Sequence, residues 1–394
     1  MVGKIGANFI KGWGMKKVIY FTIFLYMMGL LFACPGWSLH EKSAETRIEE
    51  LSQRIEQLEK QTNKTDAFFR WFDKITISGL LEVEAGYNKF DPNASGERGE
   101  ELSDIVLAAC ELGIDAAFND HIAGHVLFLW EEDDTEPVDL DEGFISLTGT
   151  EQIPVYLHAG RLYVPFGNYE SFFISDPFTL ELGETRESAV VVGYHNDILN
   201  ISAGGFNGDV DETGAKNHIE SFFAGAEWSL PEDVIPDFNL AAGISYISNI
   251  ADSDGLSDVN DLDEDGDPDG IRDYVGGFSG HISASFKDSV FCVAEYVCAV
   301  DDFEDGELQF EGVNIKQPKA WTAEIAYVTP SDIGFGVQYE GTDDCGKFLP
   351  EVSYGGVVFC YPFENTYVGV EYLYQEYENN DKNEVVTAQL AYEF

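Results

Sequence analysis

The chain of 394 residues has little positive charge. It carries 22 lysine and arginine residues against 72 aspartate and glutamate residues, which gives a formal net charge of −50 at pH 7. A protein of that sign repels phosphate groups, so DNA or RNA binding is excluded. It attracts cations instead. The same excess of acid also serves solubility or growth in high salt, and the sequence leaves that simpler explanation open.

The cysteines do not have the spacing of a metal site. No C-x-x-C pair occurs, so a zinc centre has little support. In an oxidising compartment we expect the two cysteines that flank a short apolar segment, Cys345 and Cys360, to form a disulfide. Cys292 and Cys298 are expected on one face of one strand, about 20 Å apart, which is too far to bridge. The full set is Cys34, Cys110, Cys292, Cys298, Cys345 and Cys360.

Catalytic signatures are also missing. The seven histidines do not form H-E-x-x-H, and neither G-x-S-x-G, a P-loop nor a dinucleotide fingerprint is present. We therefore expect a protein that is not an enzyme and that requires no cofactor. A catalytic triad carried on separate strands would leave no such motif, so that class stays open.

Residues 1–38 have the features of a signal peptide. Lys16 and Lys17 precede an apolar run from Val18 to Ala33, and a small-residue boundary follows. The run is short for a spanning helix, which favours cleavage over anchoring. Cys34 after Leu-Phe-Ala also resembles a lipidation site, which is an alternative.

Residues 39–72 are predicted to contain an amphipathic, coiled-coil-like helix. Ile48, Leu51, Ile55 and Leu58 follow the spacing of a heptad seam. Only two heptads are strong, fewer than a firm coiled coil needs. A stalk that makes a homo-oligomer and a single helix lying alone or against the rest of the protein are both compatible with this pattern.

From residue 73 onward the apolar residues recur with a period of two. No run of eighteen apolar residues follows residue 75, so only a closed barrel could span a membrane there. One face of each segment carries Ala, Gly, Tyr and aliphatic residues, and the other repeats Glu and Gln, as expected for a barrel with a wet interior. We predict an all-β fold for residues 73–394, a transmembrane antiparallel barrel of about sixteen strands. The clearest segments are 75–87, 221–230, 321–327, 333–340 and 368–375.

The last segment strengthens this prediction. Val386, Ala388, Leu390, Tyr392 and Phe394 share one face, and the sequence ends on the aromatic residue. This ending resembles the C-terminal signal of bacterial outer-membrane barrels. Together with the export signal, it places the protein in the outer membrane of a Gram-negative bacterium, in contact with its lipid.

Three acid-rich stretches, 131–142, 252–273 and 301–307, are expected to interrupt the strands as loops. The second matches the first half of a calcium loop, in which alternating carboxylates converge on the ion. Arg272 stands where the last ligand should be a glutamate, so a simply solvated acidic loop is the alternative. The candidate Ca²⁺ ligands of this extracellular loop are Asp261, Asp263, Asp265 and Asp267.

The middle of the chain, from residue 103 to about 256, resembles the LbtU-type siderophore porins. The matching segments include SDIVLAACELGIDAAF, DEGFISL and AGRLYVPFGNYESFFISDPFTLELGETRESAVVVGY, of which SDPFTLELGETRESA is the most specific. The resemblance implies a roughly sixteen-stranded porin that admits a ferric siderophore. A plugged receptor is excluded, because it needs a roughly 22-stranded barrel and a plug domain.

The acidic composition favours neutral or cationic solutes over anionic ones. A general cation-preferring diffusion porin and an envelope-tethering structural barrel are therefore the alternatives to siderophore uptake. Basic residues are scarce, so Arg161 and Arg186 are the candidates for a pore or ligand contact. The alternative is that each is simply paired with a nearby carboxylate.

Overall fold

The computed structural model describes residues 74–93, 98–132, 138–214, 218–231, 233–260 and 270–394. The chain divides into two compact units, Met1–Asp73 and Lys74–Phe394, and all described residues belong to the second. The predicted signal peptide (1–38), the predicted helix (39–72) and the calcium loop therefore lie outside the described residues. The calcium-loop residues concerned are Asp261, Asp263, Asp265 and Asp267.

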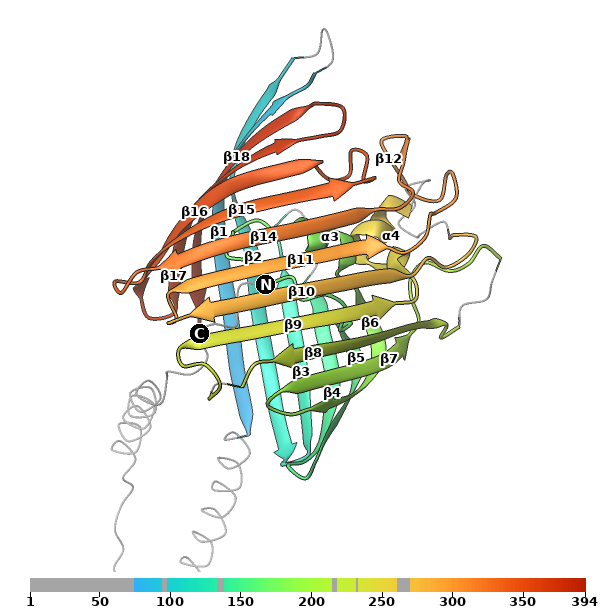
Figure 1. Cartoon of the computed structure of the whole chain (residues 1–394), viewed down its shortest axis with the longest axis vertical. Coiled ribbons are helices and arrows are strands. Elements are labelled where there is room, and N and C mark those ends of the chain that lie inside the picture. Colours follow the sequence, from blue (N-terminus) through green and yellow to red (C-terminus); the bar gives the residue numbers. More distant parts are fainter. Residues whose placement is uncertain (1–73, 94–97, 133–137, 215–217, 232, 261–269) are drawn as a thin grey trace, which may run out of the picture. The chain divides into compact units, whose positions relative to one another are not determined.

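Sixteen antiparallel strands close into one barrel, in which β1 pairs with β18 (Figure 1). The predicted fold class and strand number are confirmed. The barrel strands are β1 (Ile75–Asp91), β2 (Glu100–Asn119), β3 (Ile122–Trp130), β4 (Asp139–Thr150), β5 (Ile153–Tyr163), β6 (Arg186–His195), β7 (Leu199–Phe206), β8 (Ser221–Ser229), β9 (Phe238–Ile247), β10 (Gly277–Phe286), β11 (Val290–Ala299), β14 (Lys319–Val328), β15 (Ile333–Asp343), β16 (Val352–Phe363), β17 (Thr366–Glu376) and β18 (Lys382–Glu393).

Side chains alternate between an exposed outer face and a polar inner face. On β15, Val337 and Tyr339 are 61% and 49% exposed, whereas Gln338 and Glu340 are 5% and 1% exposed. The same alternation holds on β14 and β17, as the sequence predicted. An apolar exterior around a polar interior is the reverse of a soluble barrel.

The barrel is sealed where β1 meets the C-terminal residue. The backbone N–H of Gly79 donates to the carbonyl of Phe394, and that of Phe394 donates to the carbonyl of Gly79, both at 3.0 Å. A Cβ at position 79 would lie 2.4 Å from the Phe394 ring, so glycine lets the ring cover the seam.

The two ends of the barrel differ in their connections. Short turns join β2 to β3, β4 to β5, β10 to β11 and β16 to β17, and we call this the short-turn end. The β10–β11 turn has positive φ at Lys287 and Asp288, the conformation that matches the strand twist of a tight hairpin. The opposite, long-loop end carries the longer connections, including α3 (Phe178–Gly183), the 3₁₀ helix η1 (Ile250–Asp252), α4 (Asp254–Asn260) and the hairpin of β12 (Gln309–Phe310) and β13 (Val313–Asn314). No helix among the described residues is long and apolar enough to cross a bilayer.

Part of the interior is dry. Inner side chains such as Val191 on β6, Phe206 on β7 and Phe223 on β8 form one apolar cluster with Ile250 of η1 and Leu256 of α4. By contrast, the inner positions of β1 and β2 carry Glu82, Glu84 and Glu111, none of which is fully buried. Water therefore reaches the inner wall at β1 and β2.

Two expectations from the sequence need correction. Cys345 and Cys360 are not bonded, and all five described cysteines are free, because Cys345 is buried in the β15–β16 loop while Cys360 lies far along β16. Cys292 and Cys298 do share strand β11, as predicted. The acidic stretch 131–142 is only partly a loop, since β4 begins at Asp139. The stretch 252–273 contains the end of η1 and all of α4.

Candidate functional site

The connection between β5 and β6, residues 164–185, folds into the barrel, and we call it the inward loop. Its helix α3 contacts β11, β14 and β15 as well as α4. The turn at its start has positive φ at Gly167 and Tyr169. A Cβ on Gly167 would lie 2.2 Å from the Tyr169 ring, so only glycine fits this turn.

Glutamates on the inner wall hold the loop through its backbone. Glu295 of β11 accepts the N–H groups of Asn168 and Tyr169, one on each carboxylate oxygen, both at 2.8 Å. Glu324 of β14 accepts the Phe172 N–H at 2.8 Å and the Ser171 hydroxyl at 2.7 Å. Hydrogen bonds to carboxylates are stronger than neutral ones, so these contacts fix the first half of the loop.

The second half of the inward loop is held in the same way. Glu371 of β17 accepts the Ile174 N–H at 2.6 Å, the Ser175 N–H at 3.2 Å and the Ser175 hydroxyl at 2.6 Å. Glu340 of β15 accepts the Phe178 N–H at the start of α3 at 3.0 Å. The four glutamates, which we call the glutamate row, carry the loop along the wall from β11 to β17.

The loop presents acid to the open part of the interior. Of its residues, all of which are described, only Glu170 and Asp176 are exposed. Asp176 interacts electrostatically with Glu82 and Glu84 on β1. Carboxylates therefore stand on the loop and on the β1 wall within electrostatic range of each other, and we call Asp176, Glu82 and Glu84 the acidic rim.

Arg161 and Arg186 come together at the long-loop end, where β5 ends and β6 begins. The Arg186 guanidinium pairs closely with Asp141 and lies 3.8 Å from Asp139, while Arg161 lies 4.0 Å from Asp139. Arg186 is thus paired with carboxylates of β4, and Arg161 lies at the outer limit of ion-pair distance from one of them. Their predicted role as pore or ligand contacts stays a prediction.

Asp254, the first residue of α4, ties this helix to the inward loop and to the start of β6. The Asp254 N–H donates to the carbonyl of Glu184 at 2.8 Å, and an Asp254 carboxylate oxygen accepts the Arg186 N–H at 3.2 Å. Burial, with Asp254 close by, raises the pKa of Glu184 to about 8. Burial also raises the pKa of Asp254 to about 6, against the opposing effect of Arg186.

Among the described residues, no group of three or more His, Cys, Asp or Glu side chains is arranged to hold a metal ion. The Ca²⁺ site predicted for 261–267 lies outside them and stays a prediction.

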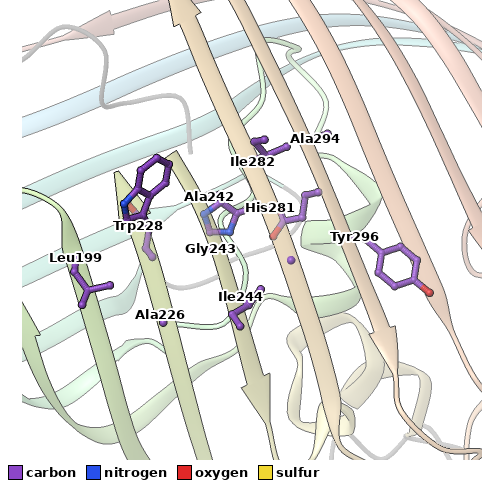
Figure 2. A pocket seen from close by; sticks show the side chains of 13 residues that line it. Leu199, Ala226, Trp228, Ala242, Gly243, Ile244, His281, Ile282, Ala294 and Tyr296 are labelled. Carbon is purple, nitrogen blue, oxygen red and sulfur yellow. The ribbon is translucent and has the colours of Figure 1, made fainter. Parts of the chain in front are cut away.

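A depression of about 670 Å³ lies between β8 and β11 and is lined by small residues between larger ones (Figure 2). Ala226, Ala242 and Ala294 occupy strand positions with the same parity as the exposed Trp228, Ile244 and Tyr296. These positions lie on the outer face of the barrel. The depression is therefore not part of a passage through the interior.

The curated relatives are proteins without an assigned activity. The chain is 27% identical over 312 residues to a UPF0422 protein of Coxiella burnetii, a match that covers 76% of this chain and 63% of that protein. It is 25% identical over 332 residues to a UPF0422 protein of Legionella pneumophila, covering 76% and 58%. The matched region thus spans about three fifths of these relatives. No family model matches the chain.

Solved structures resemble the barrel closely enough to decide its fold. The outer-membrane channel DcaP of Acinetobacter baumannii superposes with a TM-score of 0.55 at 14% identity, covering 81% of this chain and 97% of that one. The chain has a porin fold. An anion-selective porin of Comamonas acidovorans (TM-score 0.53, 9% identity, 81% and 99% covered) and OmpF of Salmonella typhi (0.51, 12%, 81% and 97%) resemble this porin-fold barrel similarly.

Sequence reasoning did not identify the residues that shape the interior of this porin fold. Glu324, Glu340 and Glu371 were recognised only as members of a wet face, and Glu295 and Asp176 were not singled out. A usable signal was present for the strand glutamates, because each stands at an inner position flanked by apolar outer residues. Nothing in the local pattern reveals that a loop more than a hundred residues earlier binds them.

Proposed function

We propose that the protein is a passive diffusion channel of the Gram-negative outer membrane that prefers cations. The acidic rim carries this proposal, because the exposed Asp176 on the inward loop lies within electrostatic range of Glu82 and Glu84 of β1. A ring of carboxylates concentrates cations and repels anions at a narrow point of a pore. The protein acts here as a channel and not as an enzyme.

The distribution of the basic residues supports the same sign of selectivity. Five lysines and arginines lie on the described barrel strands. Lys89, Lys319 and Lys382 have the parity of the outer face, and Arg161 and Arg186 are paired with Asp139 and Asp141. None of the five is left to offset the carboxylates of the acidic rim.

Reversal potentials across a planar bilayer test the proposal directly. In a tenfold KCl gradient, the reversal potential measured with the full chain should have the sign expected of a channel that is more permeable to K⁺ than to Cl⁻. Raising the salt should weaken the preference, because ions screen exposed carboxylates. An anion-selective reversal potential, or no conductance from heat-modifiable protein, would refute the proposal.

A second candidate is admission of ferric siderophores. The stretch SDPFTLELGETRESA, on which the resemblance to siderophore porins depends, lies within the inward loop and the start of β6. The acidic rim favours neutral or cationic complexes over anionic ones. Transient block of the K⁺ current by a neutral ferric siderophore, and not by its iron-free form, would support this candidate. Equal current with and without the siderophore would count against siderophore admission and favour a general diffusion channel. The third prediction, a tethering barrel, depends on residues 39–72 and stays a prediction.

A further inference from the structure

Four rings follow one another on the inner wall across β3, β4 and β5. His125 of β3 and Phe144 of β4 are cross-strand partners with ring centroids 5.1 Å apart. Phe144 meets His158 of β5 edge to face at 5.5 Å, and His158 lies 4.9 Å from Tyr156. We call these four residues the ring row. Their strand positions alternate with exposed outer residues such as Ile145 and Val155, so the rings face inward.

Glycines and hydrogen bonds fix the orientation of the rings. A Cβ on Gly193 would lie 2.1 Å from the Tyr156 ring, so the absence of a side chain there lets the ring lie against the wall. The Tyr156 hydroxyl donates to Asn200 at 3.0 Å. His125 bonds Asp115 at 2.7 Å through Nδ1. Phe144 and Tyr156 pack on one side against the apolar cluster of the interior. No member of the ring row is fully buried, so the rest of each surface is open to the interior.

Carboxylates stand at both ends of the ring row. At one end, His125 lies between Asp115 and Glu142, at 2.7 and 3.4 Å. At the other end, Glu227 of β8 interacts electrostatically with Tyr156. Neighbouring rings are tilted by 36° to 81°, so the ring row offers several separate ring faces with negative charge at both ends.

We propose that the ring row is a binding subsite for planar aromatic cations on their way through the barrel. This rests on the proposed channel function and specifies its solute. A flat cation stacks on the ring faces, which are electron-rich, while the flanking carboxylates attract its charge. An aliphatic cation gains the charge attraction without the stacking, and an aromatic anion is repelled.

Binding of 9-aminoacridine, a planar fluorescent cation, tests the subsite without requiring conduction. We would measure quenching of its fluorescence by the detergent-solubilised full chain, with Phe144→Leu and Tyr156→Leu as test variants. Each is expected to raise the dissociation constant about 3- to 10-fold, the size of one lost stacking or cation–π contact. Tyr156→Phe keeps the ring and should bind nearly as the wild type does.

Phe335→Leu is the matched control, because Phe335 is an exposed ring on the outer face of β15. It reports any binding of the dye to the outer surface or to detergent. Heat-modifiable migration of every variant shows that the barrel has formed. The inference is wrong if Phe144→Leu and Tyr156→Leu bind the dye as the wild type does, or if Phe335→Leu weakens binding equally.

Block of K⁺ current in a planar bilayer separates this inference from the channel proposal. We expect 9-aminoacridine to block more strongly than tetraethylammonium, and the two ring variants to lose that difference. Cation-selective current without ring-dependent binding would refute the subsite and keep the channel. Ring-dependent binding without any current would refute the channel and keep a binding site in the barrel interior.

Discussion

Removal of the Glu371 side chain should release the middle of the inward loop. Glu371→Ala deletes the acceptor of three hydrogen bonds, from the Ile174 N–H, the Ser175 N–H and the Ser175 hydroxyl. Hydrogen bonds to a charged group contribute roughly 1.5–3 kcal/mol each. The freed donors can bond water, so the three contributions will not add fully. We expect the free energy of local opening at Ile174 and Ser175 to fall by about 3 kcal/mol.

Hydrogen exchange at these two amides is the appropriate assay. A loss of about 3 kcal/mol corresponds to roughly a hundredfold faster exchange, since 1.4 kcal/mol is a factor of ten. Amides of β17 itself should keep their protection, because the strand ladder is untouched. Glu371→Gln retains one acceptor oxygen and should give a smaller effect.

Glu227→Ala is the matched control, because it removes an inner glutamate of β8 that makes no hydrogen bond to the inward loop within the described part of the chain. If Ile174 and Ser175 exchange at wild-type rates in Glu371→Ala, the glutamate row does not hold the loop. The same conclusion follows if Glu227→Ala accelerates them equally.

Three further predictions concern charge, pH and barrel closure. Asp176→Asn should lower the K⁺ over Cl⁻ permeability ratio about 2- to 5-fold, in line with the loss of one partly screened charge, and an unchanged reversal potential would contradict the acidic rim. Because the pKa of Glu184 is raised to about 8 from an ordinary 4.5, its protonated form favours the folded loop. That stabilisation is full below about pH 4.5 and is lost as the pH rises through about 8, so loop exchange, corrected for intrinsic rates, should accelerate over this range in the wild type. The acceleration should be smaller in Glu184→Gln, in which Glu181 and Asp254, whose pKa values burial also raises, still titrate. Gly79→Val should displace the Phe394 ring and destabilise the barrel by about 1–3 kcal/mol, seen as a lower urea midpoint of the heat-modifiable band, whereas a valine at the outer position Ala85 should have little effect.

The barrel was predictable because its signal is local. From Ile333 to Tyr339 on β15 and from Val386 to Tyr392 on β18, the outer residues are apolar and their neighbours along the strand are small or polar, so two-residue periodicity alone assigns the faces. The number of strands followed from the spacing of such segments. The final Phe394 was identified as part of a last strand, although its backbone bonds to Gly79 depend on closure.

The inward loop was not predictable from the sequence because its contacts are distant. Glu371 lies 197 positions after Ile174, and Glu324 lies 152 positions after Phe172. Local propensity gives no reason for a segment with Pro165 and Gly167 to enter the barrel. The arginines show the same limit of prediction from local sequence. Their scarcity drew attention to Arg161 and Arg186, but only the fold places Asp139 and Asp141 beside them.

The pairing of β1 with β18 has a consequence for biogenesis. The two strands that complete the cylinder are the first and last of the barrel in sequence order, so every other strand must be synthesised before the cylinder can close. Until then, β1 exposes an unpaired edge and a row of apolar side chains, which is the kind of surface that aggregates in water. We therefore expect the emerging chain to depend on chaperones until closure, and assembly to be slow compared with folding of a helical protein of this length.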